Sequence, residues 1–285
     1  MTSIQFTPAN VPKYKACPVS SSDFEKTFGI NPNELYNESF RKTAEQFGKN
    51  SLAYRNITNN INTKTLTGSN FLWNNVLNSY LPKGKRVMTI EDMEGIFAID
   101  SKYFAGHYAD MTQGLLRTTS SDRPEKKRLM SNLASQLKKV EGIKYSPENP
   151  LIISGIKIVP DKRKKNEGYG LLFDLTDATY VNDKRFAHTN QQNPREQLFG
   201  GVEKTLWTRG NDFVRVYAVV VSGVVSDDGD LPNSNVNGWV VVVSDEVANA
   251  PKFLEDLARF ETQAREARED FERRKIEIIS SIQKL

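Results

Sequence analysis

The sequence predicts an α+β fold with a mainly helical N-terminal half, an antiparallel β-sheet with long hairpins in the second half, and a long C-terminal amphipathic helix. Three observations predict it. Apolar residues recur at three- and four-residue steps through the first half, as on one face of a helix. Beyond residue 146, valine, isoleucine and aromatic residues form runs bounded by turn residues, as in strands. After Pro251 the helical spacing returns and continues to the last residue.

Residues 1–22 are expected to form an irregular N-terminal arm, because three prolines within this stretch oppose a helix. A helical region is expected over 23–145. Asn31 followed by Pro32 supplies an N-cap and a favourable first helical residue. Thr89 with Asp92 three residues later resembles a capping box. Further helices are expected to begin near Phe71, Ser101 and Ser121.

The β region is expected over 146–248. Residues 151–159 and 168–175 are predicted to be paired strands, joined by a polar, basic hairpin loop. Residues 212–226 are predicted to form one strand of up to 15 residues, with Gly223 as a bulge or bend. Residues 238–244 are predicted to return as a second long strand. Valine at consecutive positions indicates a strand buried on both faces and covered by helices.

The segment 249–285 is predicted to be one helix, roughly 50 Å long at 1.5 Å per residue. This helix either packs across the sheet of its own chain or forms a coiled coil with another chain, which would make the protein a homo-oligomer. The apolar residues expected at such an interface share one helix face: Leu257, Phe260, Phe271, Ile278 and Ile282.

Charge is unevenly distributed along the 285 residues, whose net charge is +4. The stretch 117–165 holds thirteen Lys and Arg against five Asp and Glu. Such asymmetry is typical of proteins with an anionic partner such as nucleic acid or a phosphorylated surface. The alternative is a solvated helix face followed by a charged turn. The residues expected to contact nucleic acid are Arg123, Lys126, Lys127, Arg128, Lys162, Arg163, Lys164 and Lys165.

Motifs for catalysis or cofactor binding are missing from the sequence. Neither a phosphate-binding glycine loop nor a dinucleotide fingerprint is present, and a single cysteine excludes a multi-cysteine metal site. The candidates for a catalytic site are Asp174, Asp177 and Asp183, because carboxylates can hold Mg²⁺ against a phosphate. Their spacing also suits strand ends and turns. No cofactor and no resident metal are therefore predicted.

Three functions remain open. The first is a non-enzymatic structural or assembly protein that self-associates through its C-terminal helix or its hairpins. The second is a nucleic-acid-binding protein that uses the basic stretch 117–165. The third is a metal-dependent nuclease. The chain lacks a secretory signal and any apolar run long enough to span a membrane, so a cytoplasmic protein without a membrane partner is expected. The absence of familiar motifs would suit a viral or mobile-element origin.

Overall fold

The computed structural model describes residues 15–188, 194–219, 223–227 and 230–244. Within them the helices are α1 (Phe24–Phe28), α2 (Pro32–Phe47), α3 (Leu52–Ile57), α4 (Phe71–Asn78), α5 (Ile90–Ile99) and α6 (Pro124–Leu137), with a 3₁₀ turn at Lys184–Phe186. The strands are β1 (Ala16–Pro18), β2 (Lys85–Val87), β3 (Ala109–Leu116), β4 (Leu151–Ser154), β5 (Lys157–Pro160), β6 (Leu171–Asp174), β7 (Thr179–Asn182), β8 (Arg195–Phe199), β9 (Val202–Thr208), β10 (Phe213–Val219), β11 (Gly223–Asp227) and β12 (Val241–Ser244).

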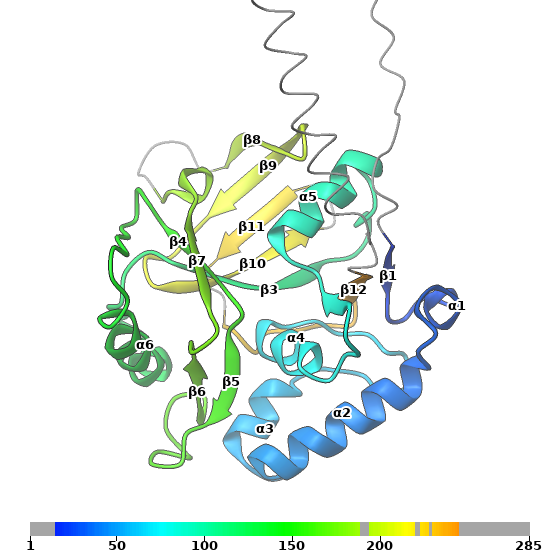
Figure 1. The fold of residues 1–285 in the computed structure, drawn as a ribbon, viewed down its shortest axis with the longest axis horizontal. Helices are drawn as coiled ribbons and strands as arrows, with labels where there is room; N and C mark the ends of the chain where they lie inside the picture. Colours follow the sequence, from blue (N-terminus) through cyan, green and yellow to red (C-terminus); the bar gives the residue numbers. More distant parts are fainter. Residues whose placement is uncertain (1–14, 189–193, 220–222, 228–229, 245–285) are drawn as a thin grey trace, which may run out of the picture. The chain divides into compact units, whose positions relative to one another are not determined.

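A curled seven-stranded sheet forms the centre of the described chain, in the order β7-β4-β3-β10-β11-β9-β8 (Figure 1). Strand β3 lies inside this sheet and pairs antiparallel with β4 and β10. Strands β9 and β11 pair in parallel, whereas the other strand pairs of this sheet are antiparallel. The sheet is therefore mixed.

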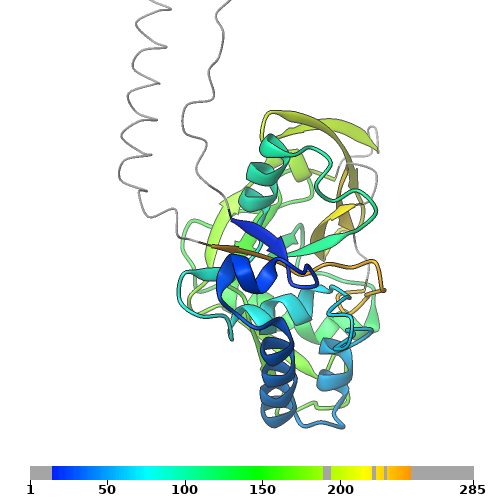
Figure 2. The same cartoon turned by 90° about the vertical axis from the view of Figure 1, so that its right-hand side faces the viewer.

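Two smaller sheets complete the described fold. Strand β12 lies between β1 and β2, with Cys17 opposite Val242 and Arg86 opposite Val243. Figure 2 shows β1 lying along β12, although the two strands come from opposite ends of the described chain. Strands β5 and β6 form a separate antiparallel hairpin, with Lys157 opposite Asp174 and Pro160 opposite Leu171.

The hydrophobic residues of the central sheet divide between two clusters, because successive side chains of a strand point to opposite faces. On β3, Leu116 belongs to the first cluster and Leu115 to the second. The first cluster joins this sheet to the fully buried Trp73 of α4 and to residues of α2, α3 and α6. The second joins it to Phe97 of α5 and to Phe199 of β8. Helices therefore cover both faces of the sheet.

Several elements agree with the local sequence signals. Asn31 Oδ1 accepts hydrogen bonds from the backbone N–H groups of Asn33 and Glu34 at the start of α2. The capping box between Thr89 and Asp92 is present at the start of α5. The predicted pairing across the basic loop is present between β5 and β6. The single strand predicted over 151–159 is wrong, because it is divided into β4, which lies in the central sheet, and β5, which lies in the hairpin.

The predicted fold class is wrong in its helical N-terminal half, because residues 101–117 do not form a helix. They form a turn segment and then β3, in which every residue is buried. Burial on both faces lets apolar residues stand at any position of the strand, so the alternation typical of a half-buried strand is hidden. Tyr103, Phe104 and Tyr108 lie before β3 and Met111 lies within it, so the spacing that resembles a helix runs across a turn segment and a strand.

The long hairpins are a second error. The single strand predicted over 212–226 is divided into β10 and β11, which fold back on each other with Val219 opposite Gly223. The strand predicted over 238–244 is β12, which lies in a different sheet. A 15-residue strand would be about three times the commonest length, so a valine-rich run of this size can hold two strands. The predicted helix over 249–285, with Leu257, Phe260, Phe271, Ile278 and Ile282, lies outside the described residues, and no long C-terminal helix is shown.

Candidate functional site

The candidate site is an open hollow between two segments that are far apart in the sequence. One wall comes from the end of α2 and the start of α3, and the other from the loop between β5 and β6, residues 161–170, called here the β5–β6 loop. The hollow has a volume of about 750 Å³, within the roughly 300–1,000 Å³ usual for ligand sites. Its lining residues are Gln46, Phe47, Gly48, Lys49, Asn50, Ser51, Ala53, Pro160, Asp161, Lys162, Lys165 and Gly170. We call it the basic pocket.

Close contact between the β5–β6 loop and α3 forms the back of the basic pocket. Gly170 has a φ of +71°, and a side chain there would meet the backbone nitrogen of Ala53 at 2.9 Å. Glycine permits both the left-handed conformation and the close approach. Beside it, the amide of Asn56 donates a hydrogen bond to the carbonyl oxygen of Tyr169 at 3.1 Å. The loop is therefore fastened directly to α3.

The other side of the β5–β6 loop is fastened to α6. Arg128 Nε donates to Asp161 Oδ2 at 2.8 Å, and a side chain at Gly168 would meet the carbonyl oxygen of Glu125 at 2.7 Å. Asp161 also accepts hydrogen bonds from the backbone N–H groups of Arg163 and Lys164. The Arg128 guanidinium, with these N–H groups, holds the pKa of Asp161 below its usual range. The carboxylate therefore remains ionised and occupied by its own partners.

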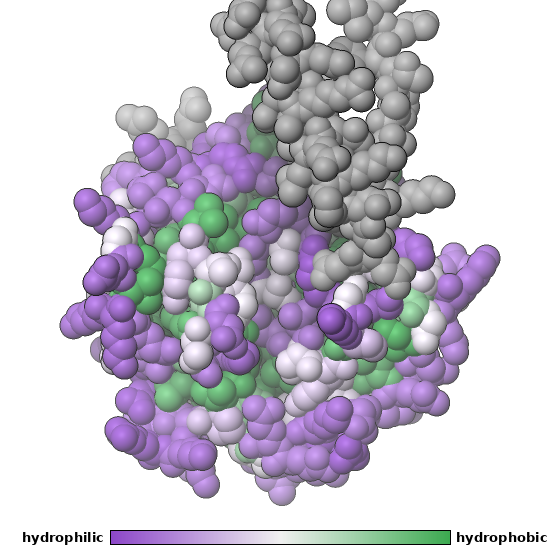
Figure 3. All heavy atoms as spheres, in the orientation of Figure 1, coloured by the Kyte–Doolittle hydropathy of each residue, from purple (hydrophilic) through white to green (hydrophobic). Residues whose placement is uncertain are grey.

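The basic pocket carries positive charge that no acidic residue of its lining neutralises. Lys49, Lys162 and Lys165 are exposed and have no ion-pair partner among the described residues. Asp161 is the single acidic residue of the lining, and Arg128 neutralises it. Figure 3 shows hydrophilic side chains along the lower edge of the molecule, where Figure 1 places α2, α3 and the β5–β6 hairpin. The pocket thus has the charge and the donors to hold an anion.

The structure brings the two predicted basic clusters, residues 123–128 and 162–165, close together through the Arg128–Asp161 ion pair. One predicted residue, Lys126, is not at the surface. Lys126 is fully buried, and its Nζ donates to Asp212 Oδ1 at 2.9 Å and to the carbonyl oxygen of Phe213 at 3.0 Å. It therefore cannot reach a phosphate outside the protein, which corrects the prediction. Lys127 is exposed on the same helix, whereas the partly exposed Arg123 is the residue before its first turn.

The remaining predicted basic residues lie around the basic pocket. Lys162 and Lys165 line it, Arg163 is exposed beside them, and Lys164 is engaged by Glu167 at 2.6 Å. Arg128 does not line the pocket, but it forms an ion pair with Asp161, which does. Lys49 was missed, because it lies more than a hundred residues from this cluster. The signal that could have indicated a close approach to the loop is the pair of glycines around Tyr169, both of which adopt positive φ.

The three candidate catalytic aspartates are each engaged locally. Asp174 accepts hydrogen bonds from the backbone N–H and hydroxyl of Thr176, Asp177 pairs with Lys157 at 2.5 Å, and Asp183 pairs with Arg185 at 2.6 Å. No group of three or more His, Cys, Asp or Glu residues in the described part of the chain is placed to hold a metal ion. The structure therefore does not assemble these residues into a site.

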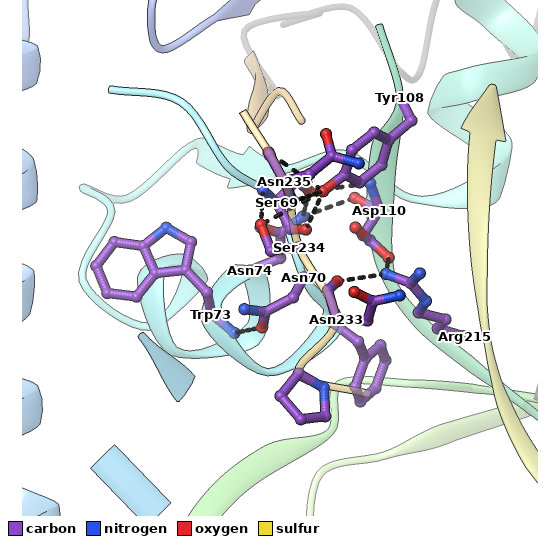
Figure 4. Close-up of polar contacts among 12 residues, drawn as sticks. Ser69, Asn70, Trp73, Asn74, Tyr108, Asp110, Arg215, Asn233, Ser234 and Asn235 are labelled. Carbon is purple, nitrogen blue, oxygen red and sulfur yellow. Dashed lines mark hydrogen bonds and ion pairs between the residues drawn. The ribbon is translucent and has the colours of Figure 1, made fainter. Parts of the chain in front are cut away.

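A buried polar cluster elsewhere stabilises the fold (Figure 4). Arg215 Nη1 donates to Asp110 Oδ1 at 2.9 Å and to the carbonyl oxygen of Asn233 at 2.8 Å. The Tyr108 hydroxyl donates to the carbonyl oxygen of Ser69 at 3.0 Å and accepts from the backbone N–H of Asn235 at 2.8 Å. These contacts fasten the segment before β12 to β3 and to the start of α4. Tyr108, Asp110 and Arg215 are all buried, so the cluster acts as an internal clamp.

Comparisons with known proteins find no match to this chain among family models, curated proteins or solved structures. Among the helices of the described residues, none is long and apolar enough to cross a membrane.

Proposed function

We propose that this protein is a non-enzymatic binding protein that holds the phosphate backbone of a nucleic acid at the basic pocket. The observation that supports this proposal is the set of three lysines, Lys49, Lys162 and Lys165, which line one hollow without ion-pair partners among the described residues. Lysine is a common phosphate ligand, and each contact releases counterions from the polyanion.

A polyanion suits the site better than a small anion, because the positive charge extends beyond the pocket. Lys127 and Arg163 are exposed on the adjoining α6 and β5–β6 loop. The loop itself is tied to α3 and α6, so the lysines are presented from a fixed backbone. A chain of phosphates can contact several of these cations at once.

The test measures binding of a fluorescein-labelled oligothymidine of about 20 nucleotides, longer than the roughly 4–16 nucleotides that one compact binding fold covers. Anisotropy is recorded between about 50 and 200 mM salt. The variant is Lys162→Gln with Lys165→Gln. The matched control is Lys138→Gln with Lys139→Gln, because both control lysines are exposed at the far end of α6. Lys138, the C-cap of α6, follows Arg128 by ten positions, a rise of about 15 Å along the helix.

The expected size of the effect follows from counterion release. A single-stranded contact contributes about 0.7 to the slope of log affinity against log salt. Loss of two contacts should make the negative slope shallower by about 1.4 and weaken binding roughly 25-fold at 0.1 M salt. The control should change affinity by less than about threefold, through long-range charge alone. Equal losses in both double variants, or an unmodified protein that does not bind the oligonucleotide, would overturn the proposal.

Self-association is a second proposal, supported by the sequence spacing of Leu257, Phe260, Phe271, Ile278 and Ile282. Light scattering coupled to size exclusion tests it. Phe271→Lys should convert an oligomer that is stable in high salt into a monomer, whereas a monomeric unmodified protein would reject the proposal.

A further inference from the structure

A second hollow adjoins the basic pocket and shares Lys49 with it. This hollow has a volume of about 430 Å³ and is lined by Phe40, Arg41, Ala44, Glu45, Lys49 and Tyr54. We call it the aromatic hollow. It lies between α2 and α3, which also form one wall of the basic pocket. A ligand that extends past Lys49 from the basic pocket therefore reaches the aromatic hollow next.

Two aromatic rings form the apolar wall of the aromatic hollow. Phe40 and Tyr54 are partly exposed, and their ring centroids are 6.5 Å apart at an interplanar angle of 81°. Phe40 in turn packs against the fully buried Trp73, with ring centroids 4.8 Å apart. Both rings are thus supported from behind by the core. Supported aromatic rings at a surface are the usual stacking platforms for nucleic-acid bases.

Two of the three charged residues that line the aromatic hollow, Arg41 and Glu45, are paired with each other. Arg41 forms ion pairs with Glu38 at 2.6 Å and with Glu45, one turn away on α2. Lys49, at the boundary with the basic pocket, has no such partner among the described residues. The basic pocket is therefore cationic, whereas the adjoining aromatic hollow has aromatic rings beside charged side chains that neutralise each other. A nucleotide has the same two parts, an anionic phosphate and an uncharged aromatic base.

We propose that the nucleic acid is single-stranded and that one of its bases enters the aromatic hollow and stacks against Tyr54. This inference rests on the proposed function, since the phosphates must lie in the basic pocket for a base to reach the hollow. A duplex could place its phosphates on the lysines, but its bases are paired and stacked inside the helix. Single strands should therefore be preferred over duplexes.

The first test compares the oligothymidine with a duplex and with an oligomer of the same length made of abasic sites. The abasic oligomer keeps every phosphate and lacks every base. With the unmodified protein, it should bind about 5- to 150-fold more weakly than the oligothymidine, the range of one stacked base. This comparison needs no variant and so does not depend on whether a substituted protein folds.

The second test uses Tyr54→Leu, with Tyr54→Phe and Tyr180→Leu as controls. Tyr180 is also a partly exposed tyrosine, but it lies on β7 and lines neither hollow. Tyr54→Leu should weaken oligothymidine binding about 5- to 150-fold, while duplex affinity and the salt slope stay unchanged. Tyr54→Phe keeps the ring and should keep the affinity, as should Tyr180→Leu.

The outcomes separate this inference from the proposed function. Equal affinity for the oligothymidine, the abasic oligomer and the duplex, together with a strong effect of the lysine variant, would overturn the base-binding inference and leave phosphate binding in place. No binding of any of these ligands would overturn both. A loss in Tyr54→Leu that is matched by Tyr180→Leu would also reject a specific role for Tyr54.

Discussion

Replacement of Lys126 should lower the stability of the protein and leave its binding surface intact. The sequence alone groups this lysine with its exposed neighbours, whereas the structure places it inside. Its side chain is 0% exposed and that of Asp212 is 9% exposed. In Lys126→Met the apolar stem is kept, but the Asp212 carboxylate loses its cation. The Ser121 hydroxyl still donates to that carboxylate.

The size of the effect follows from the burial of the pair. Removing one partner of a buried ion pair typically destabilises a protein by about 3–5 kcal/mol. The small exposure of Asp212 and its bond to Ser121 favour the lower end, about 3 kcal/mol. For a folded unit of this size, that corresponds to a fall in Tm of roughly 6–12 °C. Lys127→Met is the matched control, because Lys127 is the next residue on α6 and is exposed. A surface change of this kind should stay within about 0.5 kcal/mol.

The assay is thermal and urea unfolding followed by circular dichroism, on the unmodified protein, both single variants and the double variant Lys126→Met with Asp212→Asn. The double variant should recover part of the loss, because it no longer leaves a buried carboxylate unpaired. Below its Tm, Lys126→Met should bind the oligothymidine like the unmodified protein. Equal Tm shifts for Lys126→Met and Lys127→Met would refute the reasoning, as would a loss of binding without a loss of stability.

Three further predictions concern the loop and the internal clamp. Gly170→Ala should destabilise the β5–β6 loop and weaken oligothymidine binding, because the added Cβ would meet backbone atoms at 2.7 and 2.9 Å; unchanged Tm and affinity would contradict this contact. The Arg128 guanidinium lowers the pKa of Asp161 in the folded protein. The unfolded chain therefore binds more protons at this carboxyl group as the pH falls. The stability that this contact supplies is present above about pH 4 and is lost below it. The gap in Tm between the unmodified protein and Asp161→Asn should accordingly narrow as pH falls from 6 to about 3. Tyr108→Phe should lower the free energy of unfolding by about 1–3 kcal/mol in urea titrations, because it leaves the buried carbonyl oxygen of Ser69 and the part-buried N–H of Asn235 without their hydroxyl partner.

Local signals in the sequence predicted those elements whose ends are defined by side chains. Asn31 and Thr89 cap α2 and α5 as their positions indicate. The β5–β6 hairpin was also predicted, since its strands are apolar and its loop is polar and basic. For the two helix caps, the interactions that define the start of the helix lie within three residues, so a short stretch of sequence contains them.

Elements whose environment is set by distant residues were not predicted. Strand β3 carries Asp110 and Gln113, polar residues that a buried strand usually excludes, yet each has a polar partner on another element. Asp110 pairs with Arg215, and Gln113 Nε2 donates to Ser154 Oγ at 2.8 Å. The order of β9, β10 and β11 likewise depends on which strand edges meet, and the spacing of apolar residues carries no information about that.

The candidate site shows the same division between local and distant information. Lys162 and Lys165 were found because they stand in one basic run, but the pocket exists only because that run meets Lys49 and the start of α3. Lys126 was assigned to the surface because a lysine in a basic helix is normally exposed; its partner Asp212 lies 86 residues away. A sequence pattern can indicate positive charge, whereas burial decides which cations can reach a ligand.

The β5–β6 loop differs from an ordinary charged turn because neighbouring helices stabilise the hairpin that carries it. A two-stranded hairpin alone is only marginally stable in water. Here α6 supplies the missing partners of β6: Asn132 Oδ1 accepts from the backbone N–H of Phe173 at 3.2 Å, and Gln136 accepts from Leu175 N–H at 2.9 Å and donates to the carbonyl oxygen of Phe173 at 2.7 Å. With Gly170 against α3 as well, the backbone that carries Lys162 and Lys165 is held on two sides. Binding at this loop would therefore require the ordering of lysine side chains but not of the loop itself, which lowers the entropic cost of holding a flexible polyanion.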